Sequence, residues 1–236
     1  IELSSDAPAG SGLGGSSSIG SVFFSAISEL LNHSLDKQLA ISVVKGIESK
    51  ILDSGPAGYQ DYYPALFGGI LALLPNFDKI EVKQLYSPCL ANFLERNVTL
   101  VYSGESRHSG INNWEVYKRF FDKNLQIREG LSNIANLSYQ AYQSILNKNY
   151  DNLVNLIAEE GAERKKLFPL LVTQKMTALM NKLNAEIDGK IDLKVCGAGG
   201  GGCFLLLHNE RHCSPVEKTI NEFGMEKLDF SICPPH

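Results

Sequence analysis

Apolar residues recur at helical spacing in the first part of the chain. One run lies within residues 19–31, and its apolar members are three or four positions apart, the spacing of one face of an amphipathic helix. These members are Ile19, Val22, Phe23, Ala26, Ile27, Leu30 and Leu31. A second run, over residues 36–51, has Leu39, Val43, Ile47 and Ile51 on one face. The first run predicts a helix that buries this face, and the second predicts another helix.

Shorter apolar runs and long helical patterns fill the rest of the chain. Short apolar runs predict strands at Ile70–Leu74, Asn97–Tyr102, 191–196, 203–208 and Lys227–Ile232. Helical spacing predicts helices over 113–124, 126–148, 150–165, 173–187 and Pro215–Phe223. Helices and strands in this order predict the α+β fold class.

A glycine-serine segment, Pro8–Ser18, runs directly into the first predicted helix. Its glycines let the backbone adopt positive φ and approach a ligand closely, its serines supply hydroxyl groups, and the free N–H groups of a helix start attract anions. The segment therefore indicates a phosphate-binding loop. It lacks the lysine of the G-x-x-x-x-G-K-[ST] loop and the βαβ setting of G-x-G-x-x-G, and a flexible linker is the alternative reading.

Two further segments rich in glycine add to this picture. The small residues Gly197–Gly202 separate two short apolar runs that are predicted to be strands. Gly55–Gly69 holds Asp61 seven positions before Gly68, the first residue of a Gly-Gly pair. An aspartate in a turn is often only a turn former, but phosphoryl transfer also needs a carboxylate near the acceptor hydroxyl.

These three segments resemble the motifs of the GHMP small-molecule kinases, the family that includes galactokinase, homoserine kinase and mevalonate kinase. Pro8–Ser17 resembles the Pro-x-x-x-Gly-Leu-Gly-Ser-Ser motif, with Gly15 where the family often has serine. Gly197–Cys203 resembles the Gly-x-Gly-Gly-Gly-Gly-Cys motif, which packs against the phosphate loop in the family. The spacing from Asp61 to Gly68 matches that of the family's catalytic aspartate.

The resemblance implies a set of site residues. The phosphates of ATP would be bound by Pro8, Gly10, Ser11, Gly12, Leu13, Gly14, Gly15, Ser16 and Ser17. Ser16 and Glu48, the latter on the second predicted helix, would coordinate Mg²⁺. Asp61 would be the catalytic residue that orients or deprotonates the acceptor hydroxyl. A hydroxyl and a carboxylate suit a hard cation that keeps part of its water shell.

The acceptor side of the site is expected near Asp61. Tyr59, Tyr62 and Tyr63 flank it, and aromatic rings with hydroxyl groups suit a sugar. This Gln-Asp-x-Tyr context is closest to the sugar-kinase branch of the family, including heptose 7-phosphate kinase and fucokinase. Arg107, in a loop after a predicted strand, could bind an acceptor phosphate. Partly buried tyrosines and an unpartnered surface arginine are the alternative readings.

The fold that the resemblance implies has two domains, an N-terminal part like domain 2 of ribosomal protein S5 and a ferredoxin-like C-terminal domain. The expected division is 1–95 and 96–236. In the family the active site lies in the cleft between the domains. The resemblance also implies about ninety residues of mostly β structure before the phosphate loop, so the first part of the N-terminal domain is expected to be missing from this chain.

The composition is ordinary for a globular chain and agrees with a soluble enzyme. With 236 residues, 44% of them hydrophobic, and a net charge of −4, the chain gives no reason to expect nucleic acid as a partner. No apolar run is long enough for a membrane span, and a cytoplasmic location is expected. The five cysteines contain no C-x-x-C pair and indicate neither a zinc site nor a disulfide framework. The resemblance leaves a homodimer open.

We therefore expect a kinase that uses ATP and Mg²⁺ to phosphorylate a hydroxyl of a sugar or sugar phosphate. Two alternatives remain. A mevalonate-pathway kinase or decarboxylase would share the fold and the use of ATP, although the residues around Asp61 favour a sugar. A non-catalytic relative would bind sugar and nucleotide without transfer, and the presence of Ser16, Glu48 and Asp61 argues against it.

Overall fold

The chain divides into two compact units. A computed structural model describes residues 2–52, 57–106 and 113–236. Unit 1 consists of Ile1–Ala7, Leu13–Tyr86 and Ile232–His236, and unit 2 consists of Pro8–Gly12 and Ser87–Ser231. The chain therefore passes from one unit to the other inside the glycine-serine segment, and each unit contains part of that segment.

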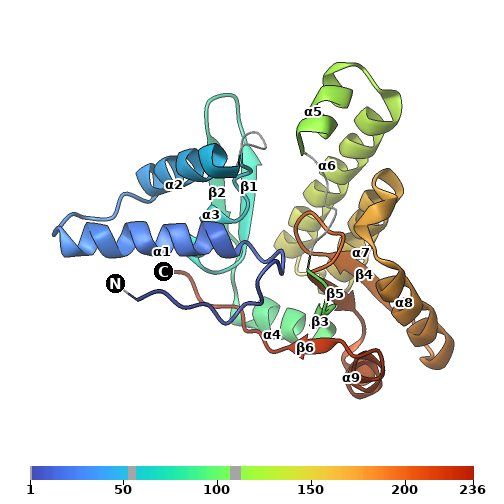
Figure 1. Cartoon of the computed structure of the whole chain (residues 1–236). Coiled ribbons are helices and arrows are strands. Elements are labelled where there is room, and N and C mark those ends of the chain that lie inside the picture. Colours follow the sequence, from blue (N-terminus) through green and yellow to red (C-terminus); the bar gives the residue numbers. More distant parts are fainter. Residues whose placement is uncertain (1, 53–56, 107–112) are drawn as a thin grey trace. The chain divides into compact units, whose positions relative to one another are not determined.

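Unit 1 combines helices with a β-hairpin (Figure 1). Its elements are α1 (Gly15–Leu30), α2 (Lys37–Leu52), α3 (Tyr62–Phe67), β1 (Leu71–Pro75) and β2 (Ile80–Gln84). The two strands are antiparallel, with Leu71 opposite Gln84 and Pro75 opposite Ile80. The core of the unit joins α2 to α3 and packs against the hairpin. It is formed by Ala40, Ile41, Val44, Tyr62, Tyr63 and Leu66.

The C-terminal tail contributes to unit 1 through the Gly-Gly pair that follows α3. The N–H of Gly69 donates a hydrogen bond to the carbonyl oxygen of Cys233 at 2.9 Å. Gly68 has a φ of 61°, and a Cβ on it would lie 2.5 Å from the carbonyl oxygen of Pro234. Glycine at position 68 is therefore required both by the backbone turn and by the approach of the tail.

Unit 2 contains a four-stranded antiparallel sheet in the order β4-β5-β3-β6. The strands are β3 (Val98–Tyr102), β4 (Asp192–Val195), β5 (Cys203–Leu207) and β6 (Glu226–Leu228). The helices of the unit are α4 (Pro88–Asn97), α5 (Asn113–Phe121), α6 (Leu125–Leu146), α7 (Tyr150–Leu167), α8 (Gln174–Glu186) and α9 (Cys213–Glu222). Helices follow β3 and β5, and a turn joins β4 to β5, so the expected ferredoxin-like β-α-β-β-α-β topology is confirmed.

The main core of unit 2 supports the turn between β4 and β5. Phe204 and Leu206 of β5 are fully buried, and they belong to the same apolar cluster as Leu179 of α8 and Ile220 of α9. Fully buried apolar side chains such as these are well ordered by close packing. The glycine-rich turn at 196–202 therefore begins and ends on rigid strands.

The apolar face of α1 lies on the surface, contrary to the prediction that the helix buries it. Val22 and Phe23 are exposed, whereas Ser17 and Ser21 are buried. A Cβ on Gly20 of α1 would lie 2.6 Å from a methyl group of a valine in α2. The small residues of α1 thus allow a close approach to α2, and the apolar residues face away from that contact.

Helix α2 exposes apolar residues as well. We define the exposed apolar stripes of α1 and α2 as Ile19, Val22, Phe23, Leu30, Leu39, Val43, Ile47 and Ile51. Their exposed fractions range from 37% to 76%.

Within the described ranges, no helix is both long enough and apolar enough to cross a membrane.

Among the α-helices and strands that the structure describes, α3, β2 and α4 were not predicted from the sequence. The expected division between residues 95 and 96 falls inside α4, whereas the contacts divide the chain after Tyr86. The other expected helices and strands are present, with ends that differ by a few residues.

Candidate phosphate-binding and catalytic site

The part of the glycine-serine segment that belongs to unit 1 ends at the start of α1. Gly14 precedes this helix and has a φ of 73°, which L side chains rarely adopt. A Cβ on Gly14 would lie 2.9 Å from both Cβ and Cγ of Asp61. The side chain of the candidate catalytic aspartate therefore packs directly on the backbone of the candidate phosphate loop, beside the N-terminus of α1.

Gly15, the first residue of α1, has a different environment. An added Cβ would meet no atom within 4 Å, and the residue is helical. The chain therefore has space at this position for the serine expected from the motif.

Glu48 receives hydrogen bonds from three hydroxyl groups. Ser16 donates to Oε1 of Glu48 at 2.5 Å, and Ser17 donates to Oε2 at 3.0 Å. The hydroxyl group of Tyr62 also donates to Oε2. The serines belong to α1, the tyrosine to α3 and the glutamate to α2. One carboxylate thus links the three described helices of unit 1.

Burial and these hydrogen bonds change the pKa values of Glu48 and Tyr62. Burial by itself would raise the pKa of Glu48, but the hydrogen bonds from Ser16, Tyr62 and Ser17 outweigh burial and lower it below its ordinary value. Burial, followed by the hydrogen bond to Glu48, raises the pKa of Tyr62 to about 12. At neutral pH Glu48 is therefore a carboxylate, and Tyr62 is a neutral donor.

The pair formed by Ser16 and Glu48 fits a divalent cation. A hydroxyl oxygen and a carboxylate oxygen lie side by side, Ser16 is exposed, and hard oxygen ligands of this kind suit Mg²⁺. In the part of the chain that the structure describes, no group of three or more His, Cys, Asp and Glu side chains is placed to hold a metal ion. A cation at this pair would therefore need phosphate oxygens and water to complete its coordination.

The part of the glycine-serine segment that belongs to unit 2, Pro8–Gly12, packs against the turn between β4 and β5. The N–H of Cys203 donates to the carbonyl oxygen of Ser11 at 2.6 Å. A Cβ on Gly12 would lie 2.9 Å from the carbonyl oxygen of Cys196. The two glycine motifs therefore contact each other through backbone atoms, as the family resemblance implies, and Gly12 has no room for a side chain.

Arg164, near the C-terminus of α7, holds the start of the same turn. Its guanidinium group donates to the carbonyl oxygen of Val195 at 3.1 Å and to that of Gly197 at 2.6 Å. A planar cation that makes two such bonds fixes the direction of the backbone as well as its position. Nothing in the sequence pattern points to Arg164, because a basic residue in the last turn of a helix is ordinarily a surface charge.

Tyr62 and Tyr63 are buried in the core of unit 1, with 1% and 3% of their surface exposed. Tyr62 was expected to meet the acceptor. The structure instead directs its hydroxyl group to Glu48, and a ring that is almost fully buried offers an acceptor no surface. The hydroxyl group of Tyr63 lies 3.4 Å from Oε1 of Gln38.

Tyr59 is the exposed member of the tyrosine cluster. The ammonium group of Lys45 lies 4.5 Å from the centre of its ring, within the range of a cation–π interaction. Tyr59 and Lys45 line a hollow of about 720 Å³ between α2 and the turn of the β1–β2 hairpin. Arg107 lies outside the described residues, so its expected contact with an acceptor phosphate stays a prediction.

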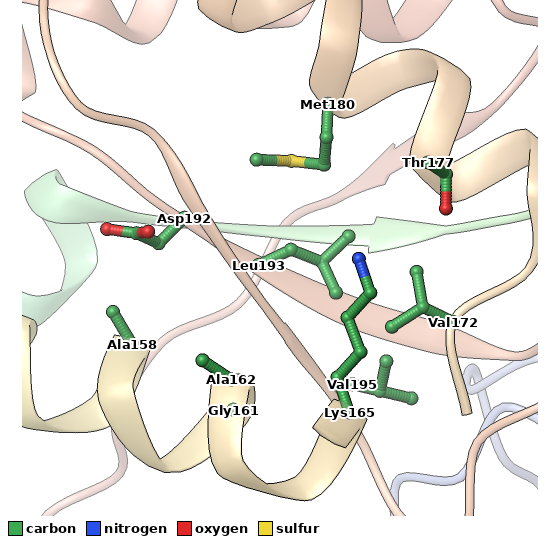
Figure 2. A pocket seen from close by; sticks show the side chains of 10 residues that line it. All are labelled: Ala158, Gly161, Ala162, Lys165, Val172, Thr177, Met180, Asp192, Leu193 and Val195. Carbon is green, nitrogen blue, oxygen red and sulfur yellow. The ribbon is translucent and has the colours of Figure 1, made fainter. Parts of the chain in front are cut away.

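A smaller cavity of about 160 Å³ lies within unit 2, between α7, α8 and β4 (Figure 2). Apolar side chains such as Met180 and Leu193 form much of its wall. Figure 2 shows the carboxylate of Asp192 directed away from the amine of Lys165. A cavity of this volume holds only a few water molecules, and its lining contains none of the expected site residues.

Residues 1–69 match the family model of the GHMP kinases N terminal domain. Glucuronokinase 1 from Arabidopsis thaliana is 22% identical over 240 residues, which cover 99% of this chain and 63% of that protein. Mevalonate kinase from Archaeoglobus fulgidus is 24% identical over 218 residues, which cover 88% of this chain and 64% of that protein. The chain thus spans less than two thirds of the length of both relatives.

The fold is shared with a solved galactokinase. The crystal structure of Lactococcus lactis galactokinase complexed with galactose matches this chain with a TM-score of 0.71 at 17% identity, covering 95% of this chain and 67% of that one. The expected α+β fold class is therefore confirmed. Residues 1–69 are therefore similar to the N-terminal domain of the GHMP kinases, and the chain shares its fold with a solved member of that family, the galactokinase.

Proposed function

We propose that the protein containing this chain is a kinase that transfers the γ-phosphoryl group of ATP to a hydroxyl of a sugar or sugar phosphate. The observation that carries the proposal is the packing of Asp61 on Gly14, two positions before the Ser16 that is hydrogen-bonded to Glu48. A helix start that can bind phosphate, two oxygen ligands for a cation and a carboxylate are thereby gathered within unit 1. Phosphoryl transfer relies on these components.

Each component has a distinct role in the proposed reaction. The backbone N–H groups at the start of α1 would bind phosphate oxygens. Ser16 and Glu48 would hold Mg²⁺, which when bound neutralises charge on the phosphates. Asp61 would accept a hydrogen bond from the acceptor hydroxyl and orient or deprotonate it. A position against the phosphate loop suits this last role, because the acceptor must approach the γ-phosphoryl group.

A sugar is the acceptor that the relatives favour. The names glucuronokinase and galactokinase refer to sugars, and the match to the glucuronokinase covers 99% of the chain. The match to mevalonate kinase has a similar identity, 24%, but it covers a smaller share of the chain, 88%. Mevalonate is therefore the second candidate acceptor, and the proposed roles of Ser16, Glu48 and Asp61 are the same for either acceptor.

Asp61→Asn tests the proposal. We expect turnover to fall by a factor of about 100 or more, the usual contribution of general acid–base catalysis, while ATP affinity changes by no more than a few-fold, because Asp61 acts on the acceptor. Turnover is measured by coupled ADP release and ATP affinity by isothermal titration. Asp122→Asn, a change at an exposed aspartate of unit 2, serves as the control and should leave both values unchanged.

The acceptor is identified by running the wild-type protein against galactose, glucuronic acid, heptose phosphates and mevalonate. Transfer to a sugar supports the proposal, whereas transfer to mevalonate alone assigns the second candidate. ATP binding without transfer to any of them would instead support a non-catalytic binding protein. Wild-type turnover in Asp61→Asn would remove this residue from the reaction.

A further inference from the structure

The two oxygens of the Glu48 carboxylate have different partners. Oε1 accepts the hydrogen bond from Ser16, the exposed serine of the pair. Oε2 accepts from Ser17 and Tyr62, both of which are buried. One oxygen thus faces the accessible side of the site, while the other is held from the interior.

Tyr62 is well suited to hold Oε2. Its ring is 1% exposed and packed within the core of unit 1, so its hydroxyl group has a fixed position. That hydroxyl group donates its hydrogen bond to Oε2 of Glu48. A glutamate side chain has several rotatable bonds, and a buried donor removes much of this freedom at Oε2.

We propose that Tyr62 is a positioning residue for the metal-bound nucleotide: together with Ser17 it holds Oε2 of Glu48, so that Oε1 and the hydroxyl of Ser16 are presented together to the Mg²⁺ of Mg-ATP. This inference rests on the proposed function, which requires a cation at Ser16 and Glu48. Loss of a residue that orients a metal ligand by a hydrogen bond typically lowers metal affinity by about 10- to 100-fold.

The same tyrosine connects the cation ligands to the candidate catalytic residue. Tyr62 is the first residue of α3, and Asp61 immediately precedes it. Asp61 packs on Gly14, while Tyr62 reaches Glu48. One short segment therefore sets the positions of the acceptor-binding carboxylate and of the metal-binding carboxylate. A tyrosine that only filled the core would need no contact with Glu48.

Tyr62→Phe removes the donor and keeps the ring. We expect this variant to bind Mg-ATP about tenfold more weakly, with the affinity for ATP in the presence of EDTA unchanged, because the hydroxyl acts through the cation. Both affinities are measured by isothermal titration. Mn²⁺ electron paramagnetic resonance reports cation binding in the presence of nucleotide without any need for turnover.

Tyr63→Phe is the matched control. Tyr63 is the neighbouring buried tyrosine in the same core, and its hydroxyl lies near Gln38 instead of Glu48. This variant should show wild-type Mn²⁺ binding and wild-type affinities for ATP with and without Mg²⁺. Thermal unfolding of both variants shows whether they lose stability to a similar extent.

A second variant tests the same inference if the Tyr62→Phe protein does not fold. Ser17→Ala removes the other donor to Oε2. It should lower the affinity for Mg-ATP but not that for metal-free ATP, and by a smaller factor than Tyr62→Phe does, because Tyr62 remains. Two results would overturn the inference. One is an equal fall in the affinities for Mg-ATP and for metal-free ATP in the folded variants. The other is a fall in Mg-ATP affinity no larger than that in Tyr63→Phe.

The inference and the proposed function fail in different ways. If the wild-type protein prefers Mg-ATP and Ser16→Ala removes the preference but Tyr62→Phe does not, only the role of Tyr62 is wrong. If the wild-type protein binds Mn²⁺ neither alone nor with nucleotide, the cation site of the proposed function is wrong, and the role of Tyr62 falls with it.

Discussion

At the scale of single residues, two adjacent glycines of the candidate phosphate loop are under opposite constraints. Gly14 combines a positive φ with close contact to Asp61, whereas Gly15 is helical and has open space where a side chain would be. A side chain at position 14 would both strain the backbone and push the candidate catalytic aspartate away. Position 15 imposes neither penalty.

Gly14→Ala and Gly15→Ala should therefore have opposite effects on stability. We expect Gly14→Ala to lower the free energy of unfolding by more than about 1 kcal/mol, because alanine is strained at positive φ. Gly15→Ala should raise it by up to about 1 kcal/mol, because alanine is favoured over glycine in a helix. Urea denaturation measures both changes. Equal destabilisation by the two substitutions would contradict this reading of the loop.

The residues of the candidate site could be predicted from the sequence to different degrees. Ser16, Glu48 and Asp61 could be identified because each follows from a motif or a spacing, and the structure brings Ser16 to Glu48 and Asp61 to the loop. Their chemical roles stay predictions. The contact of Tyr62 with Glu48 could not be predicted, because it depends on how α2 and α3 pack, which neither spacing nor residue type specifies.

At the scale of elements, most helices and strands were predicted, including the short strands β4 and β6, whereas α3, β2 and α4 were not. α3 covers only Tyr62–Phe67, too few residues for a helical period to be recognised. β2, Ile80–Gln84, does alternate apolar and polar residues, but over only five positions. α4 begins after Ser87, whose side chain caps the helix, with proline as its first residue, and this start signal could have identified it.

Substitution of Arg164 tests whether α7 supports the turn between β4 and β5, because its side chain links the helix to that turn. Arg164→Met should lower the free energy of unfolding by about 2 kcal/mol, because it removes charge-assisted hydrogen bonds to two carbonyl groups. The turn packs on Pro8–Gly12, so hydrogen exchange at residues 196–203 should also accelerate. Urea denaturation and exchange mass spectrometry measure the two effects.

Lys166→Met is the control for Arg164. Lys166 lies in the same helix turn and pairs with Glu163 at 3.6 Å on the surface, a kind of ion pair that contributes at most about 1 kcal/mol. Its removal should leave exchange in the glycine-rich turn unchanged. If the two variants exchange alike, Arg164 does not support the turn.

At the scale of the whole molecule, the chain folds into units assembled from distant segments. Pro8–Gly12 belongs with residues 87–231, and the tail from Ile232 belongs with residues 13–86. Unit 1 has a modest core, and α1 and α2 leave long apolar side chains on its surface. Helical periodicity could predict which residues share a face, but it could not predict that α1 uses its small residues for contact with α2.

Two neighbouring valines of α2 test this arrangement. Val43 is 37% exposed, whereas Val44 is 7% exposed and approaches α1 at Gly20. Val43→Gln should change the free energy of unfolding of the chain by no more than about 0.5 kcal/mol, as expected for a surface position. Val44→Gln should lower it by about 2 kcal/mol or more, because it places an amide group in the contact between the helices.

The exposed apolar stripes of α1 and α2 should also govern how the chain behaves at high concentration. Exposed apolar side chains in this number promote association, so we expect the chain to self-associate and the double variant Val22→Gln with Val43→Gln to do so less. Light scattering coupled to size-exclusion chromatography measures this. The pair Leu125→Gln with Leu170→Gln, at exposed positions of unit 2, is the control and should leave self-association unchanged. An equal reduction in both double variants would show that apolar exposure in general, and not these two helices, drives the association.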